Sequence, residues 1–235
     1  VTAALVAAGG ILIPALEKKG ILIGAHIKAC AGVKDRGFEN LQEDLENLKK
    51  ADFPLLDQEK RPEIEAAVLK ARSENDSAGG KVETAITGLP AGLGEPWFGT
   101  LDGMLALAMF SIGAVKGVEF GEGFGLADMK GSEANDPFRI SEDGRVYTET
   151  NNNGGINGGI SNGMPVIFTC AVKPTPTIAK EQKTIDFING RNIDFAAKGR
   201  HDPAIVRRIC PVIESVAALV IADQLAGGYG CDWLE

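Results

Sequence analysis

The chain has 235 residues, 44% of them hydrophobic and 24% charged, so it can form a full hydrophobic core and is not disordered as a whole. Its formal net charge of −8 disfavours a nucleic-acid partner, which requires a basic surface, but still permits a small anionic ligand held by local cations. Glycine, at 30 residues, is unusually frequent and has no period, which excludes collagen and indicates many tight loops.

The four cysteines are far apart in the sequence and form no C-x-x-C pair, and only two histidines are present. We therefore expect neither a metal site nor a disulfide framework, and this cysteine usage favours a reducing cytoplasm. No apolar run approaches the roughly 18 residues of a membrane helix. The apolar start lacks a preceding basic region, so a signal peptide is not expected. The sequence has no initial methionine and starts as if an upstream segment were missing.

The first two elements are expected to be a helix and a strand. Thr2 is the expected N-cap of a helix that runs to about Lys19, and Gly20 closes it. Alternating apolar residues over 20–32 predict a strand. His26 lies on the opposite parity from the isoleucines of this strand, and we interpret it as a surface or sheet-edge histidine rather than a catalytic one.

The remaining elements predict a mixed fold. Residues 36–75 are rich in charge and contain two helical stretches, which we interpret as a surface excursion without chemistry. Helices are expected at 40–50, 61–75, 101–112 and 203–225, strands at 81–90, 115–121 and 164–172, a hairpin at 139–150 and a polar stretch at 179–202. This order is neither βαβ alternation nor all-β. We therefore predict an α+β fold of antiparallel sheets with covering helices, as a single domain over 1–235.

A loop rich in glycine and asparagine, NNNGGINGGISNG, occupies residues 151–163. Its backbone can approach a ligand closely, and its N–H groups can bind oxyanions. The alternative is an ordinary hairpin connection, which the length disfavours because most hairpin loops have about 2–5 residues. No P-loop and no nucleophile elbow is present elsewhere in the sequence.

A stiff segment, Lys173-Pro174-Thr175-Pro176-Thr177, follows the buried strand at 164–172. Its two prolines restrict the backbone and hold a lysine and two hydroxyls in place, which suits a phosphate group. A rigid exit from the strand is an equally good interpretation of this motif alone.

The segment Gly199-Arg200-His201-Asp202-Pro203 precedes the last helix. Asp202 is expected to cap that helix, with Pro203 at its first position, which is a sufficient structural explanation for the aspartate. It does not explain Arg200 and His201. Near the positive end of a helix, Arg200 is well suited to a phosphate or carboxylate.

Together these segments resemble the chorismate synthase family over essentially the whole chain. The matching stretches, in the order and spacing of the family, are DSAGGKVE (76–83), PAGLGEP (90–96), SIGAVKGVEFGEGF (111–124), GSEANDPF (131–138), NNNGGINGGISNGMP (151–165), KPTPTI (173–178) and GRHDP (199–203). The resemblance implies the C-terminal part of a β-α-β sandwich.

The resemblance also implies an activity. Chorismate synthases are lyases of the shikimate pathway of aromatic amino acid biosynthesis, and they eliminate phosphate from 5-enolpyruvylshikimate 3-phosphate to give chorismate. The elimination is 1,4-anti and has no net redox change, yet it requires reduced FMN, which supplies transient electron density and whose N5 helps remove the C6 hydrogen. Some members reduce the flavin with NADPH and others depend on external reduction. A cytoplasmic homotetramer is implied.

Residue roles follow from the matched motifs. The family's flavin contacts fall on Gly113, Ala114, Gly158, Lys173, Pro174, Thr175, Pro176, Thr177 and Arg200. Arg200 is also placed to meet the anionic substrate. Asp202 resembles the carboxylate that manages protons around flavin N5. We assign no proton-transfer role to His201.

The sequence departs from the family pattern in several places. Family members begin with a region that carries a Ser-His-Gly motif, further arginines and a second catalytic histidine, which are not present here. Val1 and Leu5 stand where a glutamate and an arginine are common, and Gly113 where a side-chain amide is common. The alternative function is therefore a non-catalytic remnant, in which Lys173 and Arg200 bind a flavin or anion without acid–base chemistry.

Overall fold

The centre of the molecule is a five-stranded sheet with the strand order β2-β1-β3-β9-β4, seen in a computed structural model that describes residues 1–234. Every neighbouring pair is antiparallel, which confirms the predicted type of sheet. Its strands are β1 (Leu22–Cys30), β2 (Val33–Lys34), β3 (Gly80–Thr87), β4 (Val115–Phe120) and β9 (Val166–Val172). The two-stranded pairs are β5 (Phe138–Ile140) with β6 (Val146–Thr148), β7 (Ile156–Asn157) with β8 (Ile160–Ser161), and β10 (Gln182–Asp186) with β11 (Arg191–Phe195).

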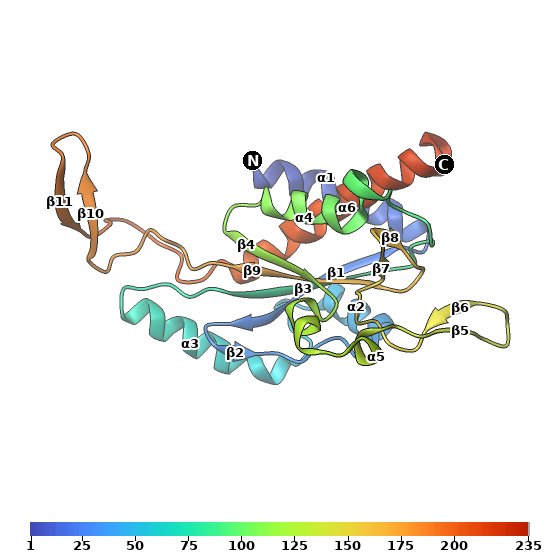
Figure 1. Ribbon diagram of the computed structural model, residues 1–235. Helices are drawn as coiled ribbons and strands as arrows, with labels where there is room; N and C mark the ends of the chain where they lie inside the picture. The colour runs from blue at the N-terminus through green and yellow to red at the C-terminus, as the bar shows by residue number, and fades with distance from the viewer. Residues whose placement is uncertain (235) are drawn as a thin grey trace.

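Helices cover both faces of this sheet (Figure 1). On one face lie α1 (Thr2–Lys18), α4 (Leu101–Phe110) and α6 (Val206–Tyr229). On the other lie α2 (Leu41–Lys50) and α3 (Arg61–Ser73), the two helices expected between residues 36 and 75. The short α5 (Gly131–Ala134) precedes the β5–β6 hairpin. The core forms where α6 packs on β1 and β3 and where α1 packs on α6.

Helix α6 is attached to β1 by a buried carboxylate. The N–H of Ala25 in β1 donates to Oε1 of Glu214 at 2.7 Å, and burial raises the pKa of Glu214 to about 7. By length and composition α6 could cross a membrane, although the sequence analysis excluded a run of that kind. More than half of its apolar stretch is buried inside the structure, as is typical of a core helix.

The start of α6 corrects one prediction. The helix begins at Val206 with Ile205 at the N-cap and no side-chain capping bond, so Asp202 does not cap it. The carboxylate of Asp202 instead accepts a hydrogen bond from Nη1 of Arg208 at 2.6 Å. The partner of Asp202 is therefore the guanidinium of Arg208 and not the backbone N–H groups at the start of a helix. Similarly, Thr2 lies inside α1, whose N-cap is Val1.

His26 is buried, so the prediction of a surface or sheet-edge histidine is wrong. Its side chain has no exposure, because the segment that leads into α2 covers this face of β1. Nδ1 lies 3.2 Å from Oδ2 of Asp35, and Nε2 lies 2.9 Å from Oε2 of Glu83. With a carboxylate at each ring nitrogen, both nitrogens can donate when the ring is protonated, and, against the opposing effect of burial, these two partners raise the pKa of His26. Lys28 pairs with the same glutamate.

The crossing of α1 and α6 leaves no room for a side chain at Gly9. A Cβ built there lies 2.2 Å from Oγ of Ser215 and 2.7 Å from its Cα, whereas one at Gly10 has no neighbour within 4 Å. We expect Gly9→Ala to lower the free energy of unfolding by about 1–3 kcal/mol through overpacking. Gly10→Ala, the matched control, is expected to raise it by up to about 1 kcal/mol through helix propensity. Urea denaturation measures both; equal effects of the two substitutions would contradict the tight crossing.

The polar stretch predicted at 179–202 contains a hairpin, β10–β11, which projects from the body of the molecule (Figure 1). The Asn189-Gly190 pair in its turn is a hairpin signal, and Gly190 has a φ of +62°. Its large apolar side chains are exposed, namely Ile185, Phe187, Ile188 and Phe195.

Candidate functional site

The predicted site residues of the two strands β4 and β9 meet at one end of the sheet. Val115 pairs with Val172, so the residues just outside the ladder, Ala114 and Lys173, are neighbours. The N–H of Lys173 donates to the carbonyl of Ala114 at 2.9 Å. Ala114 has a φ of +79°, a region that an alanine occupies at a cost of about 1–3 kcal/mol. Such strain is typical of functional sites, and here it places the 113–114 backbone beside the lysine.

Residues 76–80 connect this strand end to the segment before α6. Oγ of Ser77 donates to the carbonyl of Thr175 at 2.6 Å, and the N–H of Ala78 donates to the carbonyl of Pro203 at 2.7 Å. A Cβ at Gly79 would lie 2.5 Å from the carbonyl oxygen of Val172, so only glycine permits this approach. The stretch DSAGGKVE (76–83) was matched in the sequence. Its role in joining segments 173–177 and 199–203 becomes visible only in the fold.

The joined segments present cations and unused polar atoms. The side chains of Lys173 and Arg200 are exposed, and neither has a carboxylate partner within residues 1–234. Oγ1 of Thr175 and Nε2 of His201 are buried and have no hydrogen-bond partner in the described chain. A buried polar atom without a partner costs about 1–3 kcal/mol, which a ligand would recover. These residues fit a phosphate-bearing anion such as FMN.

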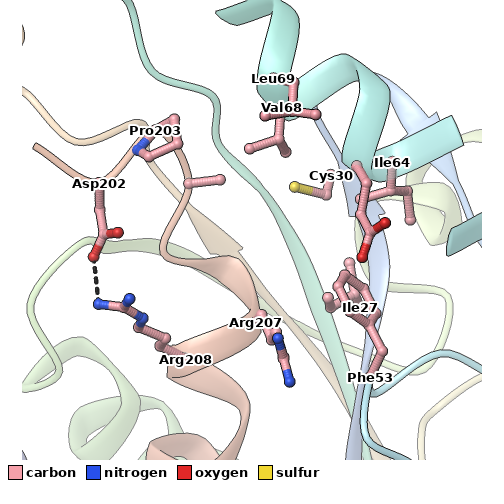
Figure 2. Close-up of a pocket in the computed structure, with 12 residues that line it drawn as sticks. Ile27, Cys30, Phe53, Ile64, Val68, Leu69, Asp202, Pro203, Arg207 and Arg208 are labelled. Atoms are coloured by element: carbon pink, nitrogen blue, oxygen red, sulfur yellow. Dashed lines mark hydrogen bonds and ion pairs between the residues drawn. The ribbon is translucent and has the colours of Figure 1, made fainter. Parts of the chain in front are cut away.

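Two cavities adjoin Asp202 and Pro203. The larger, of about 370 Å³, lies between α3 and the start of α6. Figure 2 shows Val68 and Leu69 on its α3 side and Asp202 turned toward Arg208 on the other. The smaller, of about 210 Å³, is also lined by Arg200 and His201. Asp202 therefore stands between the two cavities and is half-buried.

The larger cavity is lined mainly by apolar side chains and by one thiol, that of Cys30 (Figure 2). Burial raises the pKa of Cys30 to about 11, so the thiol is protonated near neutral pH and is not a nucleophile. Cys170 and Cys210 are likewise buried and free. No group of three or more His, Cys, Asp or Glu side chains capable of holding a metal occurs in the part of the chain that the structure describes.

Gly158 lies apart from the other predicted flavin contacts. It occupies the turn between β7 and β8, with a φ of +58°, and the carbonyl of the adjacent Gly159 accepts from the N–H of Leu101 at the start of α4. Gly113 follows the far end of α4. A helix of ten residues is about 15 Å long, so the structure does not bring Gly158 to the strand end that holds Lys173.

The asparagine-rich loop is held by a buried carboxylate that the sequence analysis did not single out. Asp136 accepts hydrogen bonds from Oγ1 of Thr150, from the N–H groups of Asn152 and Asn153 and from Nδ2 of Asn153, at 2.7–2.9 Å. Burial alone would raise the pKa of Asp136, but these donors hold it below its usual value. Its place in the matched stretch GSEANDPF was the available signal. The aspartate fixes the start of this loop.

The chain is similar to chorismate synthases both in its three-dimensional structure and in its sequence. A crystal structure of a chorismate synthase superposes with a TM-score of 0.81 and 30% identity, covering 97% of this chain and 64% of that one. The family model of chorismate synthase matches residues 1–226. The chorismate synthase of Methanosarcina barkeri is 47% identical over 220 residues, 94% of this chain and 60% of the relative. That of Pyrococcus abyssi is 44% identical over 225 residues, 95% of this chain and 62% of the relative.

The mixed helices and antiparallel sheet of this chain are therefore those of a chorismate synthase fold. The chain belongs to the chorismate synthase family, a family of lyases. It spans about 60% of the length of the curated relatives that it matches.

Proposed function

We propose that the chain forms part of a chorismate synthase that eliminates phosphate from 5-enolpyruvylshikimate 3-phosphate. In this elimination a C–H bond and the C–O bond to phosphate break, the phosphate leaves with the bonding pair, and a new C=C bond forms, so no net oxidation occurs. The observation that carries the proposal is that four matched segments, 76–80, 113–114, 173–177 and 199–203, meet at one strand end. There Lys173 and Arg200 have no acidic partner within residues 1–234.

Reduced FMN is the proposed cofactor, and when bound it supplies electron density to the substrate as phosphate departs. The residues proposed to bind it at the strand end are Gly113, Ala114, Lys173, Pro174, Thr175, Pro176, Thr177 and Arg200. Gly158 lies apart from them and is proposed as a flavin contact on the family resemblance alone. The support is the strained backbone at Ala114 and the buried, unpartnered hydroxyl of Thr175. Arg200 is also proposed to bind substrate, and Asp202 to accept or hold a proton beside the cofactor.

Further proposals concern the whole protein. We infer a homotetramer in the cytoplasm, with residues 1–235 acting as part of a single domain and with NADPH or an external donor reducing the flavin. The exposed apolar residues of the β10–β11 hairpin provide surface for subunit contacts. No observation favours the non-catalytic remnant. Anaerobic conversion of the substrate to chorismate by the product of the complete reading frame tests the activity, and FMN binding without turnover would support the remnant instead.

Lys173→Ala is expected to weaken FMN binding about 10- to 100-fold, the scale of one hydrogen bond from a charged group, about 1.5–3 kcal/mol. Lys173 directly precedes the stiff Pro174–Pro176 backbone, and its side chain is exposed, so its ammonium can reach a bound phosphate. Flavin fluorescence titration gives the affinity. Lys18→Ala, which removes an exposed lysine of α1, is the control. Equal affinities for the two variants would remove Lys173 from the site.

A further inference from the structure

The smaller cavity beside Asp202 is built partly from the helical excursion. Its walls are the last turn of α3 and the residues after it, residues 178–179 and residues 199–203. The sequence analysis assigned no chemistry to the excursion, yet Arg72 of α3 faces this cavity together with Arg200 and His201. At about 210 Å³ the cavity lies below the roughly 300–1,000 Å³ of sites for drug-sized ligands, so it suits a single small group rather than a ring system.

The unpaired charges that line the cavity are positive. Two carboxylates line it, but Asp76 is paired with Nζ of Lys180 at 2.9 Å, and Asp202 is paired with Arg208. Neither Arg72 nor Arg200 has an acidic partner anywhere in residues 1–234. Two guanidinium groups without counter-ions at one small cavity attract an oxyanion, because guanidinium binds phosphate and carboxylate oxygens through paired N–H donors.

An imidazole nitrogen is a third polar group at this cavity, beside the two guanidinium groups. Nε2 of His201 is buried and has no hydrogen-bond partner in the chain as described. A favourable interaction of Arg72 with the carboxyl end of α3 explains the presence of a cation at that position. It does not explain the buried imidazole nitrogen without a partner in the same cavity, or the second guanidinium that lines it.

The walls are held together by contacts between distant segments. The N–H of Lys180 donates to the carbonyl of Asn75 at 3.0 Å, and Ser77 bonds the carbonyl of Thr175. Asn75 adopts a φ of +58°, the left-handed conformation that ends α3 and turns the chain toward Lys180. Arg72 is thereby kept at the cavity by backbone geometry rather than by a salt bridge, which leaves its guanidinium available.

We propose that Arg72, Arg200 and His201 form a phosphate-binding subsite, to which the excursion contributes Arg72. This proposal rests on the proposed function for the source of its ligand, which is either the phosphate of FMN or the inorganic phosphate that the elimination releases. Both sources present a tetrahedral phosphate group with at least two anionic or hydrogen-bonding oxygens. The chemistry of the subsite does not depend on which one occupies it.

The test is Arg72→Gln in the protein expressed from its complete reading frame, with Lys70→Gln as the matched control. Both residues are exposed cations of α3, but only Arg72 lines the cavity. Isothermal titration with inorganic phosphate is expected to show affinity about 10- to 100-fold weaker for Arg72→Gln and unchanged for Lys70→Gln. Circular dichroism confirms that both variants are folded.

Parallel titrations with FMN and riboflavin identify the source. If the subsite holds the flavin phosphate, Arg72→Gln weakens FMN binding and leaves riboflavin binding unchanged. If it holds released phosphate, both flavins bind as in the wild type and only inorganic phosphate is affected. Phosphate affinity that is equal in Arg72→Gln and wild type, or absent in both, overturns the subsite. Loss of phosphate binding on Arg72→Gln in a protein without lyase activity would overturn the proposed function and keep the subsite.

Discussion

Asp202→Asn is expected to lower turnover by about 10²- to 10⁴-fold, the usual contribution of a positioned acid or base. The amide keeps the size of the side chain and can still accept from Arg208, but it cannot take up a proton. Because Asp202 does not cap α6, the substitution removes no helix-capping bond. Its pair with Arg208 is substantially exposed, so stability should change by at most about 1 kcal/mol. Anaerobic chorismate formation and the melting temperature measure the two effects separately.

Arg208→Gln provides the comparison that separates the ion pair from the carboxylate. It removes the same pair while leaving the carboxylate of Asp202 in place, so the loss of turnover should be far smaller than for Asp202→Asn. If both variants lose turnover equally, the ion pair and not proton transfer is what matters at this position. A stable Asp202→Asn variant with normal turnover would make Asp202 a structural residue.

His26→Gln is expected to destabilise the protein by about 3–5 kcal/mol near pH 6, because it leaves two buried carboxylates without their shared cation. Burial alone would lower the pKa of His26, but its hydrogen bonds to Asp35 and Glu83 outweigh burial and raise the pKa above 6.5. A raised pKa contributes stability that is complete below the unfolded-state value and is lost as the pH rises through the folded-state value.

The carboxylates of Asp35 and Glu83 set the lower pH limit of the stabilisation that the His26 network provides. Burial would raise the pKa values of Glu83 and Asp35, but their hydrogen bonds lower both, so their contribution is lost as the pH falls below about 4. The difference in stability between wild type and His26→Gln should therefore be largest at about pH 4.5–6.5 and shrink on either side. Urea denaturation across pH measures it. The double variant with Glu83→Gln should recover part of the loss; a pH-independent difference would contradict the network.

The helices and central strands could be predicted because their patterns are local. Gly20 ends α1, and the isoleucines of β1 recur at every second or fourth position, so they lie on one face of the sheet. The burial of His26 could not be predicted, because the residues that cover it come from the excursion on the opposite face of the sheet. The β10–β11 hairpin carried a usable signal in Asn189-Gly190, which was outweighed by the polar residues around it.

The candidate site was predictable as a set of motifs and not as an arrangement. Lys173 and Ala114 are neighbours only because β9 and β4 pair in this register, and Gly158 is separated from them by the length of α4. Asp202 showed a cap-like sequence context, but the helix begins three residues later than that context suggests and the aspartate finds Arg208 instead. Arg72 had no motif at all, because its place at the site depends on where α3 ends.

The bonds that close the site join segments far apart in the chain, since Ser77 and Thr175 are 98 residues apart and Asp76 and Lys180 are 104 apart. Contacts of such long range must overcome the entropy of closing a large loop, so we expect them to form late on the folding pathway. The site would then be complete only in the finished fold, and a ligand would bind after the folding transition state. Ligand binding would therefore slow unfolding and prolong the lifetime of the native protein, while leaving the rate of folding nearly unchanged.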